Sequence, residues 1–237
     1  MKQINTAMIL AAGRGERMRP LTDTIPKPLL EVKGKALIEY HLEHLAQAGI
    51  ERVVINHAWL GHKIVDRLGD GSRYNLAIHY SKEETALETA GGIIQALPLL
   101  CDAENESHFL VVNGDIFSDF SFANMLTSVR EKINEQGHEA QLAHLILVPN
   151  PPHHPNGDFY LQDQQVSKLL SKDTDGVKYT FSGIGVYSRA LFSHLPQGNL
   201  RLAPVLTEAM AQKRVSGTLY TGAWTDIGTP QRLAQLN

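Results

Sequence analysis

Short apolar runs alternate along the first part of the chain with stretches in which apolar residues recur every three or four positions. Residues 7–10, 53–55, 76–80, 109–112 and 145–148 form the short runs, which predict buried strands. Residues 37–48, 64–68, 92–97 and 122–136 have helical spacing, and Gly49 and Pro98 are placed to end two of these helices. The alternation predicts an α/β fold, a Rossmann-like, mainly parallel sheet with helices on both faces.

The pattern changes after residue 148. A loop rich in proline and histidine over 149–155 is followed by short runs at 159–161, 166 and 180–187, which predict antiparallel strands. Helical spacing returns at 191–195, 204–212 and 232–236. We therefore predict a single domain over 1–237, with one part at about 1–148 and a smaller β-rich part at about 149–237. Ligands of such sheets bind at the carboxyl ends of the parallel strands.

Composition narrows the class of protein. The 237 residues include 22 Lys+Arg and 25 Asp+Glu, for a net charge of −3, and 43% are hydrophobic. This balance excludes a disordered chain and argues against a basic nucleic-acid binder. The single Cys101 excludes an intramolecular disulfide and a cysteine-based zinc site. Without an apolar run of membrane-spanning length or a signal peptide, we expect a cytoplasmic protein with no nucleic-acid or membrane partner.

A glycine-rich, cationic loop follows the first predicted strand. Gly13 and Gly15 let backbone amides approach a phosphate, and the arginines at 14, 17 and 19, with Lys27, add positive charge. The loop is not a dinucleotide fingerprint, because Met18 takes the place of its third glycine, nor a Walker A loop, which needs a following G-K-[ST]. A glycine-rich turn with solvated arginines is the alternative interpretation.

The longer string around this loop resembles that of the sugar-1-phosphate nucleotidyltransferases. The matching strings are G-x-G-x-R-M-x-P-L-T at 13–22 and P-K-P-L at 26–29. Further matches, at 49–55, 89–91, 113–115, 181–184 and 224–229, extend the resemblance over nearly the whole chain. It implies a nucleotide-binding part at about 1–148 and a sugar-binding, metal-completing part at about 149–237.

The resemblance also implies roles for particular residues. It makes Arg17, Lys27 and Asp115 catalytic, and assigns magnesium to Asp115 and Asp226. Two carboxylates, completed by water and phosphate oxygens, suit Mg²⁺, although either aspartate alone also fits a turn or a helix cap. The nucleotide-binding residues that it implies are Leu10, Ala11, Ala12, Gly13, Arg14, Gly15, Arg17, Lys27, Thr89, Gly91 and Asp115.

The reaction of this family explains why no further catalytic machinery is visible. A sugar 1-phosphate oxygen is already anionic, so its attack on the α-phosphorus of a nucleotide needs no general base. The protein must align two anions and stabilise the leaving pyrophosphate. No G-x-S-x-G or H-E-x-x-H motif of a hydrolase occurs.

The sugar side departs from the family pattern. Glu88 replaces the first residue of the usual G-T-A-G string, and the usual Glu-Lys-Pro is absent, which leaves Lys172 as a weak candidate for the sugar phosphate and a surface lysine as its alternative. The strings at 56–61, 87–89, 150–154, 157–159 and 202–204 are similar to the N-acetylmuramate 1-phosphate uridylyltransferases of cell-wall recycling. The sugar-binding residues that we expect on this basis are Glu88, Asn150, Asp158, Ser182, Gly183 and Arg201.

Two alternatives stay open. One is a glucose- or mannose-1-phosphate nucleotidyltransferase that uses UTP, dTTP or GTP in place of UTP with N-acetylmuramate 1-phosphate. The other is an inactive nucleotide-sugar sensor. Because the chain ends soon after Asp226, we expect no appended regulatory region, and a monomer or a small homo-oligomer.

Overall fold

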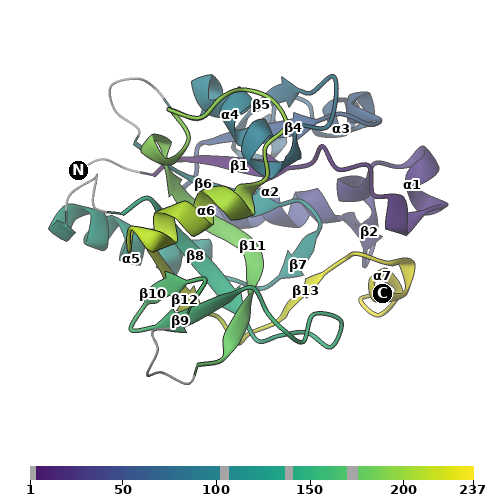
Figure 1. Ribbon diagram of the computed structural model, residues 1–237. Coiled ribbons are helices and arrows are strands. Elements are labelled where there is room, and N and C mark those ends of the chain that lie inside the picture. The colour runs from purple at the N-terminus through teal and green to yellow at the C-terminus, as the bar shows by residue number, and fades with distance from the viewer. Residues whose placement is uncertain (1–3, 102–106, 137–140, 170–175) are drawn as a thin grey trace.

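A single nine-stranded sheet organises the molecule (Figure 1), in a computed structural model that describes residues 4–101, 107–136, 141–169 and 176–237. The strand order is β5-β4-β1-β6-β11-β8-β12-β10-β9. In chain order these strands are β1 (Thr6–Leu10), β4 (Arg52–His57), β5 (Ala77–Lys82), β6 (His108–Asn113), β8 (Ala143–Val148), β9 (Phe159–Gln162), β10 (Gln165–Ser167), β11 (Lys178–Ser188) and β12 (Val215–Leu219).

Two small ribbons and a set of helices complete the described part of the chain. The ribbons pair β2 (Glu31–Val32) with β3 (Lys35–Ala36), and β7 (Ile116–Ser118) with β13 (Trp224–Asp226). The α-helices are α1 (Leu21–Thr24), α2 (Leu37–Gln47), α3 (Gly61–Leu68), α4 (Glu88–Leu100), α5 (Phe122–Gln136), α6 (Leu202–Ala211) and α7 (Pro230–Ala234). Short 3₁₀ helices are η1 (Glu16–Met18), η2 (Lys27–Leu29), η3 (Ser72–Tyr74) and η4 (Arg189–Leu191).

The α/β class is confirmed, but the sheet is mixed rather than mainly parallel. β5, β4, β1 and β6 are parallel neighbours, as the sequence predicts. β11 then runs antiparallel between β6 and β8, and the β9–β10 hairpin joins the far edge of the same sheet. A strand pattern does not reveal that a later strand inserts between two earlier ones, because the insertion depends on long-range pairing.

Two predicted helix boundaries are wrong. α4 begins at Glu88 and continues through Pro98 to Leu100. Proline lies in the last turn, where its missing N–H removes one helical hydrogen bond and the Cys101 amide still bonds to the Leu97 carbonyl. In the segment 191–195, only Leu191 is helical, as the last residue of η4. The rest of the segment is a turn, from which the fully buried side chain of Phe192 enters the core.

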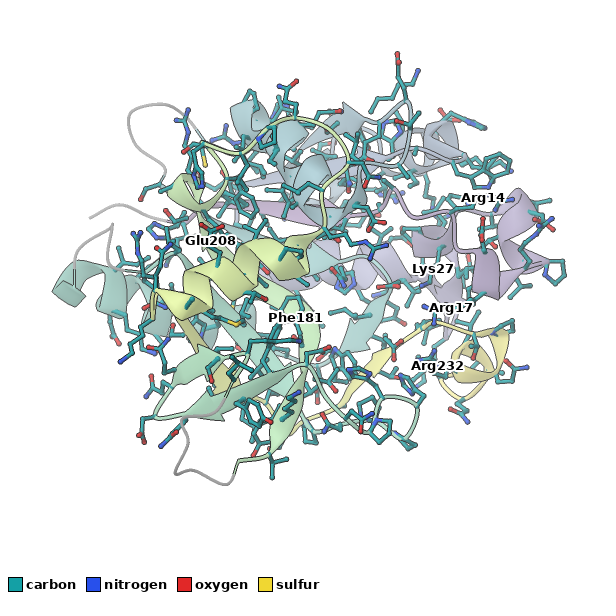
Figure 2. The ribbon with its side chains drawn as sticks, viewed as in Figure 1. Arg14, Arg17, Lys27, Phe181, Glu208 and Arg232 are labelled. Carbon is teal, nitrogen blue, oxygen red and sulfur yellow. The ribbon has the colours of Figure 1, made fainter. Side chains whose placement is uncertain are left out.

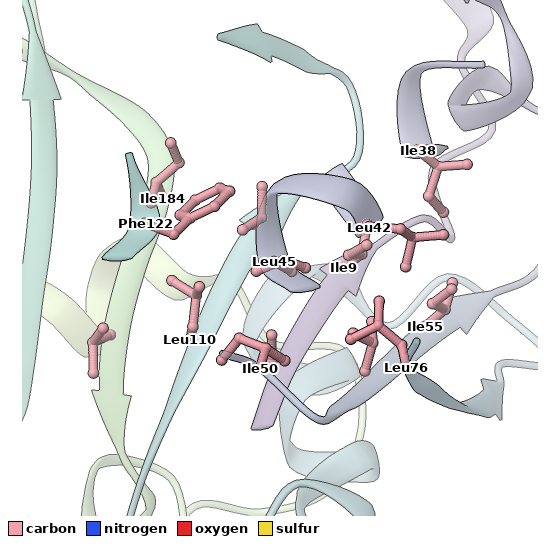
Figure 3. Packing of buried hydrophobic residues seen from close by; sticks show 14 of the residues in the cluster. Ile9, Ile38, Leu42, Leu45, Ile50, Ile55, Leu76, Leu110, Phe122 and Ile184 are labelled. Carbon is pink, nitrogen blue, oxygen red and sulfur yellow. The ribbon is translucent and has the colours of Figure 1, made fainter. Parts of the chain in front are cut away.

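The sheet is apolar on both faces, which explains its continuous hydrophobic strands. In β1, Ala7 and Ile9 pack in the cluster formed with α2, α3 and α5, shown in Figure 3. Met8, between them, packs on the other face with α4 and α6. This alternation places helices on both faces, as predicted, and leaves the strand ends free to carry polar groups.

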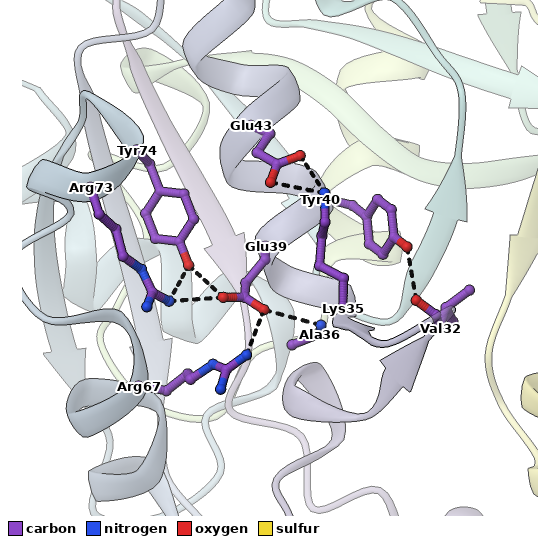
Figure 4. A network of polar contacts seen from close by, with 9 residues as sticks. All are labelled: Val32, Lys35, Ala36, Glu39, Tyr40, Glu43, Arg67, Arg73 and Tyr74. Carbon is purple, nitrogen blue, oxygen red and sulfur yellow. Dashed lines mark hydrogen bonds and ion pairs between the residues drawn. The ribbon is translucent and has the colours of Figure 1, made fainter.

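Outside the core, a buried carboxylate connects three helical segments beside the sheet. Glu39, in the first turn of α2, accepts hydrogen bonds from Arg67 at 3.0 Å, Arg73 at 2.8 Å, Tyr74 at 2.7 Å and the Ala36 amide at 3.1 Å (Figure 4). Burial raises the pKa of Glu39, but the bonds from Arg67, Tyr74 and Ala36 outweigh it, and the pKa is lowered. The ionised carboxylate thus fixes α3 and η3 against α2.

None of the helices in the described ranges combines the length and apolarity needed to cross a lipid bilayer.

Candidate active site

A cavity of about 520 Å³ opens at the carboxyl ends of β1, β4 and β6. Its walls come from the loop after β1 (residues 10–13 and 15–18), from Lys27 and Pro28, and from Asn56 at the end of β4. Glu83, residues 86–89, the turn 113–115 and Gly228 complete it. These segments lie far apart along the chain, and the parallel part of the sheet brings them to one edge.

The loop after β1 turns sharply at Gly15. Its φ of +68° is in the left-handed region, and a side chain there would meet Thr22 at 3.0 Å. The Thr22 hydroxyl donates to the Gly15 carbonyl at 2.8 Å, which fixes the turn. Arg17 follows in η1; it lines the cavity, is exposed, and has no ion-pair partner within the described ranges. A guanidinium that is not paired within the protein is available to an anion.

Arg14 lies away from the cavity, although we expected it to contact nucleotide. Its guanidinium donates to the Thr22 carbonyl at 2.9 Å and pairs with Asp23 at 3.3 Å. It also lies over the ring of Trp59, 3.9 Å from the centroid. These contacts hold the loop against α1 and leave the cationic role inside the cavity to Arg17 and Lys27.

Lys27 and Asp115 meet within the cavity. Lys27, at the start of η2, keeps only 11% of its side chain exposed, and its Nζ forms an ion pair with Oδ2 of Asp115. Asp115 follows the last residues of β6, as the sequence predicts. The pair joins a cation and an acid that we expected to act on the same phosphates, and both line the space that those phosphates would occupy.

Asp226 lies next to this turn on β13. In the β7–β13 ribbon, Asp226 is opposite Ile116, and the Ile227 amide donates to the Asp115 carbonyl at 2.8 Å. The two candidate metal ligands therefore belong to neighbouring backbone segments. Oδ1 of Asp226 contacts Arg232, and His153 Nε2 at 2.8 Å. Figure 2 shows Arg17, Lys27 and Arg232 at the same end of the molecule.

The segment that starts α4 has an unusual backbone. Glu88 has a φ of +60°, a backbone conformation that residues other than glycine rarely adopt. Its carboxylate lies 3.8 Å from Arg201, which is the residue before α6, and Glu88 and Thr89 line the cavity. A residue held in this conformation at a cavity wall is a candidate for function.

Gly91 packs against the protein rather than facing the cavity. A side chain there would lie 2.1 Å from the Gly198 carbonyl oxygen. The amides of Ala90 and Gly91 donate to the Leu200 carbonyl at 3.0 and 3.1 Å. The glycine is thus needed for the contact between α4 and the segment before α6.

Five residues expected to bind sugar lie outside the cavity wall: Arg201, whose guanidinium faces Glu88, and four that have other partners within the protein. Asn150 bonds to the Pro155 and Lys178 carbonyls and to Thr180. Asp158 accepts from the Phe181 amide at 2.8 Å. Ser182 accepts from the Ile184 amide, and Gly183, with a φ of +83°, lies against Asn113. They shape the loop after β8 and the bulge in β11. Lys172 falls outside the described residues.

Several residues of the cavity wall are not among the site residues that the sequence predicts. Asn56 is the second-last residue of β4, Glu83 follows β5 and Asn113 ends β6, and all three line the cavity. A polar residue directly after an apolar strand is the signal that could have identified them. Arg232 and His153, which contact Asp226, have no such signal, because their sequence neighbours are ordinary turn and helix residues.

This combination of fold and site is that of a nucleotide-binding transferase, and the chain belongs to the nucleotidyl transferase family, whose model matches residues 6–237. The chain is 52% identical over 234 residues to the N-acetylmuramate alpha-1-phosphate uridylyltransferase of Neisseria meningitidis serogroup B, covering 97% of this chain and 95% of the relative. It is 31% identical to the protein of the same name from Caulobacter vibrioides, covering 95% of this chain and 92% of that one.

More distant relatives have names that refer to other substrates. The mannose-1-phosphate guanylyltransferase of Mycobacterium tuberculosis is 30% identical over 95% of this chain and 61% of its own length. Among solved structures, a putative glucose-1-phosphate thymidylyltransferase from Bacillus anthracis superimposes with a TM-score of 0.81 at 21% identity, over 98% of this chain and 93% of that one. This structural likeness supports the fold alone.

Proposed function

We propose that the protein transfers the uridylyl group of UTP to N-acetyl-α-muramate 1-phosphate, with release of pyrophosphate, as a step of cell-wall recycling. The observation that carries the transferase chemistry is the meeting of Arg17, Lys27 and Asp115 around one cavity. The choice of base and sugar rests on the 52% identity to a uridylyltransferase of that specificity over nearly the full length of both chains.

The cavity suits the binding of two mutually repelling anions. The backbone of 12–13 and the turn at Gly15 offer amides to the triphosphate, while Arg17 and Lys27 supply charge. One cation about 4 Å from one phosphate charge contributes roughly 4 kcal/mol at an effective dielectric near 20, before desolvation. The sugar phosphate oxygen attacks the α-phosphorus, the bond to the β-phosphate oxygen breaks, and the pyrophosphate leaves with its electron pair. No proton needs to be removed.

The acidic side chains at this site are suitable ligands for magnesium. Within the described residues no group of three or more His, Cys, Asp or Glu side chains is placed to hold a metal, but Mg²⁺ usually takes one or two carboxylates, and the neighbouring Asp115 and Asp226 supply two. When bound, the ion would neutralise charge on the reacting phosphates. Lys27 pairs with Asp115 and Arg232 pairs with Asp226, so each carboxylate is held in place by a cation, and Lys27 also lines the cavity.

On the sugar side, the proposal relies on Glu88, which lines the cavity, and on Arg201 beside it. N-acetylmuramate differs from other amino sugars by a lactyl ether that carries a carboxylate. Arg201 has the bidentate geometry for this group, and Glu88 can accept hydrogen bonds from sugar hydroxyls or the amide. Their own contact is long, 3.8 Å, and both are well exposed, so neither is tied to the other.

A matrix of nucleotides and sugar phosphates tests this function. Purified protein is assayed for pyrophosphate release with UTP, dTTP, GTP and CTP, each against N-acetyl-α-muramate, glucose and mannose 1-phosphates, with Mg²⁺ and with excess EDTA. We expect the highest kcat/KM for UTP with N-acetyl-α-muramate 1-phosphate, and loss of activity with EDTA. Activity with GTP and mannose 1-phosphate but none with UTP contradicts the proposal, and nucleotide-sugar binding without turnover favours a sensor.

A further inference from the structure

A pair of buried polar side chains joins the two walls of the cavity. Asn56 is the second-last residue of β4 and Glu83 follows β5, and each residue is only 3% exposed. The Asn56 side-chain amide donates to Glu83 Oε1 at 2.6 Å. Burying an amide beside a carboxylate is unfavourable unless the remaining polar atoms are satisfied, so their other partners indicate the role of the pair.

Both remaining partners are backbone amides of the cavity wall. Oδ1 of Asn56 accepts from the Ala11 amide at 2.9 Å, in the loop after β1. Oε2 of Glu83 accepts from the Leu87 amide at 3.2 Å, directly before α4. One continuous chain of three hydrogen bonds therefore runs from the loop after β1, through Asn56 and Glu83, to the opposite wall.

Gly92 of α4 packs directly against this chain of hydrogen bonds. A side chain on Gly92 would lie 2.6 Å from Glu83 Oε1 and 2.9 Å from the Asn56 amide nitrogen. Both distances are too short for a carbon atom. The helix can pack this closely on the pair only because residue 92 has no side chain, and α4 in turn carries the wall that contains Glu88 and Thr89.

We infer that Asn56 and Glu83 are positioning residues, a hydrogen-bonded clamp that sets the spacing between the loop after β1 and the 86–89 wall and so preorganises the site for nucleotide. The inference rests on the proposed function, since it needs a nucleotide to span the two walls. Losing the clamp frees two backbone amides and lets both segments shift, and misplacement by about 1 Å can cost about 100-fold in rate.

The direction of each hydrogen bond in the clamp allows a rescue experiment. In Glu83→Gln, one of the two acceptor oxygens becomes an NH2 group, which then faces a donor, either the Asn56 side-chain amide or the Leu87 amide, and loses that hydrogen bond. In Asn56→Asp, two carboxylates face each other. In the double variant, the new carboxylate at position 56 accepts from the Ala11 amide and from the new side-chain amide at position 83, whose carbonyl oxygen accepts from the Leu87 amide. The double variant restores all three bonds and keeps the net charge of the wild type.

Two measurements report on these variants: calorimetric binding of a non-hydrolysable UTP analogue with Mg²⁺, and hydrogen exchange of the Ala11 and Leu87 amides in the free protein. We expect each single variant to raise the Kd about tenfold or more and to speed exchange at one or both amides, and the double variant to recover both. Gly92→Ala, which wedges the pair apart without changing its chemistry, should raise the Kd as the single variants do.

The outcomes are distinguishable. Wild-type protein that binds no nucleotide refutes the proposed function, and the clamp's role with it. If wild type binds and the double variant is as weak as Glu83→Gln, Glu83 contacts the nucleotide directly and the clamp is overturned. Single variants with lower melting temperature but unchanged Kd overturn it as well, because the pair is then only structural. Glu84→Gln, one residue along and exposed, is the matched control.

Discussion

Lys27 and Asp115 lie 88 positions apart in sequence, and their side chains form an ion pair inside the cavity. The contact gives a largely buried lysine a partner of opposite charge before any substrate binds. It also places the acid at the end of β6 within reach of the loop after β1, which the pairing of strands β1 and β6 makes possible.

Removing the charge of Asp115 should abolish catalysis and leave the fold intact. Asp115→Asn keeps the size of the side chain but removes one of the two proposed magnesium ligands and the partner of Lys27. We expect kcat to fall about 10³-fold or more, which is about 4 kcal/mol. The melting temperature should change little, because the side chain is 35% exposed and the asparagine oxygen can still accept a hydrogen bond from Lys27. Pyrophosphate release measures the effect.

The matched control is Asp119→Asn, in the same region but outside the cavity wall, where the carboxylate contacts Tyr220. It should leave turnover unchanged. A fully active Asp115→Asn variant would refute the catalytic assignment.

Glu88 combines backbone strain with a place at the rim of the cavity. Glu88→Gly relieves a left-handed φ and should stabilise the protein by about 1 kcal/mol, while the loss of the carboxylate raises KM for the sugar phosphate severalfold and leaves KM for UTP unchanged. Thermal unfolding and steady-state kinetics with each substrate varied measure the two effects.

Glu88→Ala separates these contributions. It removes the carboxylate but keeps a side chain at positive φ, so KM for the sugar phosphate should rise without a gain in stability. An unchanged KM in both variants would show that Glu88 has no part in sugar recognition.

His144 makes stability depend on pH. Burial, followed by the charge of Lys132, lowers the pKa of His144 from 6.5 to about 4, and its ring nitrogens lie 2.7 Å from the Ser216 hydroxyl and 3.1 Å from the Thr218 hydroxyl. On acidification the unfolded chain takes up the proton first. The contribution of the neutral His144 to the free energy of unfolding is therefore fully present above pH 6.5. It amounts to about 3 kcal/mol and is lost as the pH falls towards 4.

Urea unfolding of wild type and His144→Gln between pH 7.5 and 4 measures this contribution. The glutamine can still bond to both hydroxyls but does not titrate, so its stability should fall less steeply with acidification. Parallel curves for the two proteins would exclude His144 as a source of the pH dependence.

The parallel half of the sheet was predictable because its strands are buried on both faces and are therefore continuously apolar, as Phe109–Val112 illustrates. The insertion of β11 between β6 and β8 was not predictable, because the pattern of apolar and polar residues in β11 does not show whether the strand lies at an edge or at the centre of the sheet. Pro98 did not mark the end of α4, because a proline in the last turn is compatible with a helix that continues.

For the site, the position of the loop glycines, Lys27 and Asp115 at one cavity was predictable, because these residues occur in short strings of concentrated chemistry. Asn150, Asp158 and Ser182 matched the family strings equally well, yet their polar atoms bond to nearby backbone. A sequence shows which residues can bind a ligand, but it does not show which of them already have hydrogen-bond partners within the folded protein. Asn56 and Glu83 show the converse, because their pairing exists only across β4 and β5.

The central claim is that one cavity aligns a sugar phosphate with the α-phosphorus of UTP, and isotope tracing tests it most directly. The protein is incubated with N-acetyl-α-muramate 1-phosphate, Mg²⁺ and UTP labelled with ³²P at either the α- or the γ-phosphate. The account predicts α-label in the UDP-sugar and γ-label in pyrophosphate. Label released as orthophosphate, or no labelled UDP-sugar from α-labelled UTP, would contradict it.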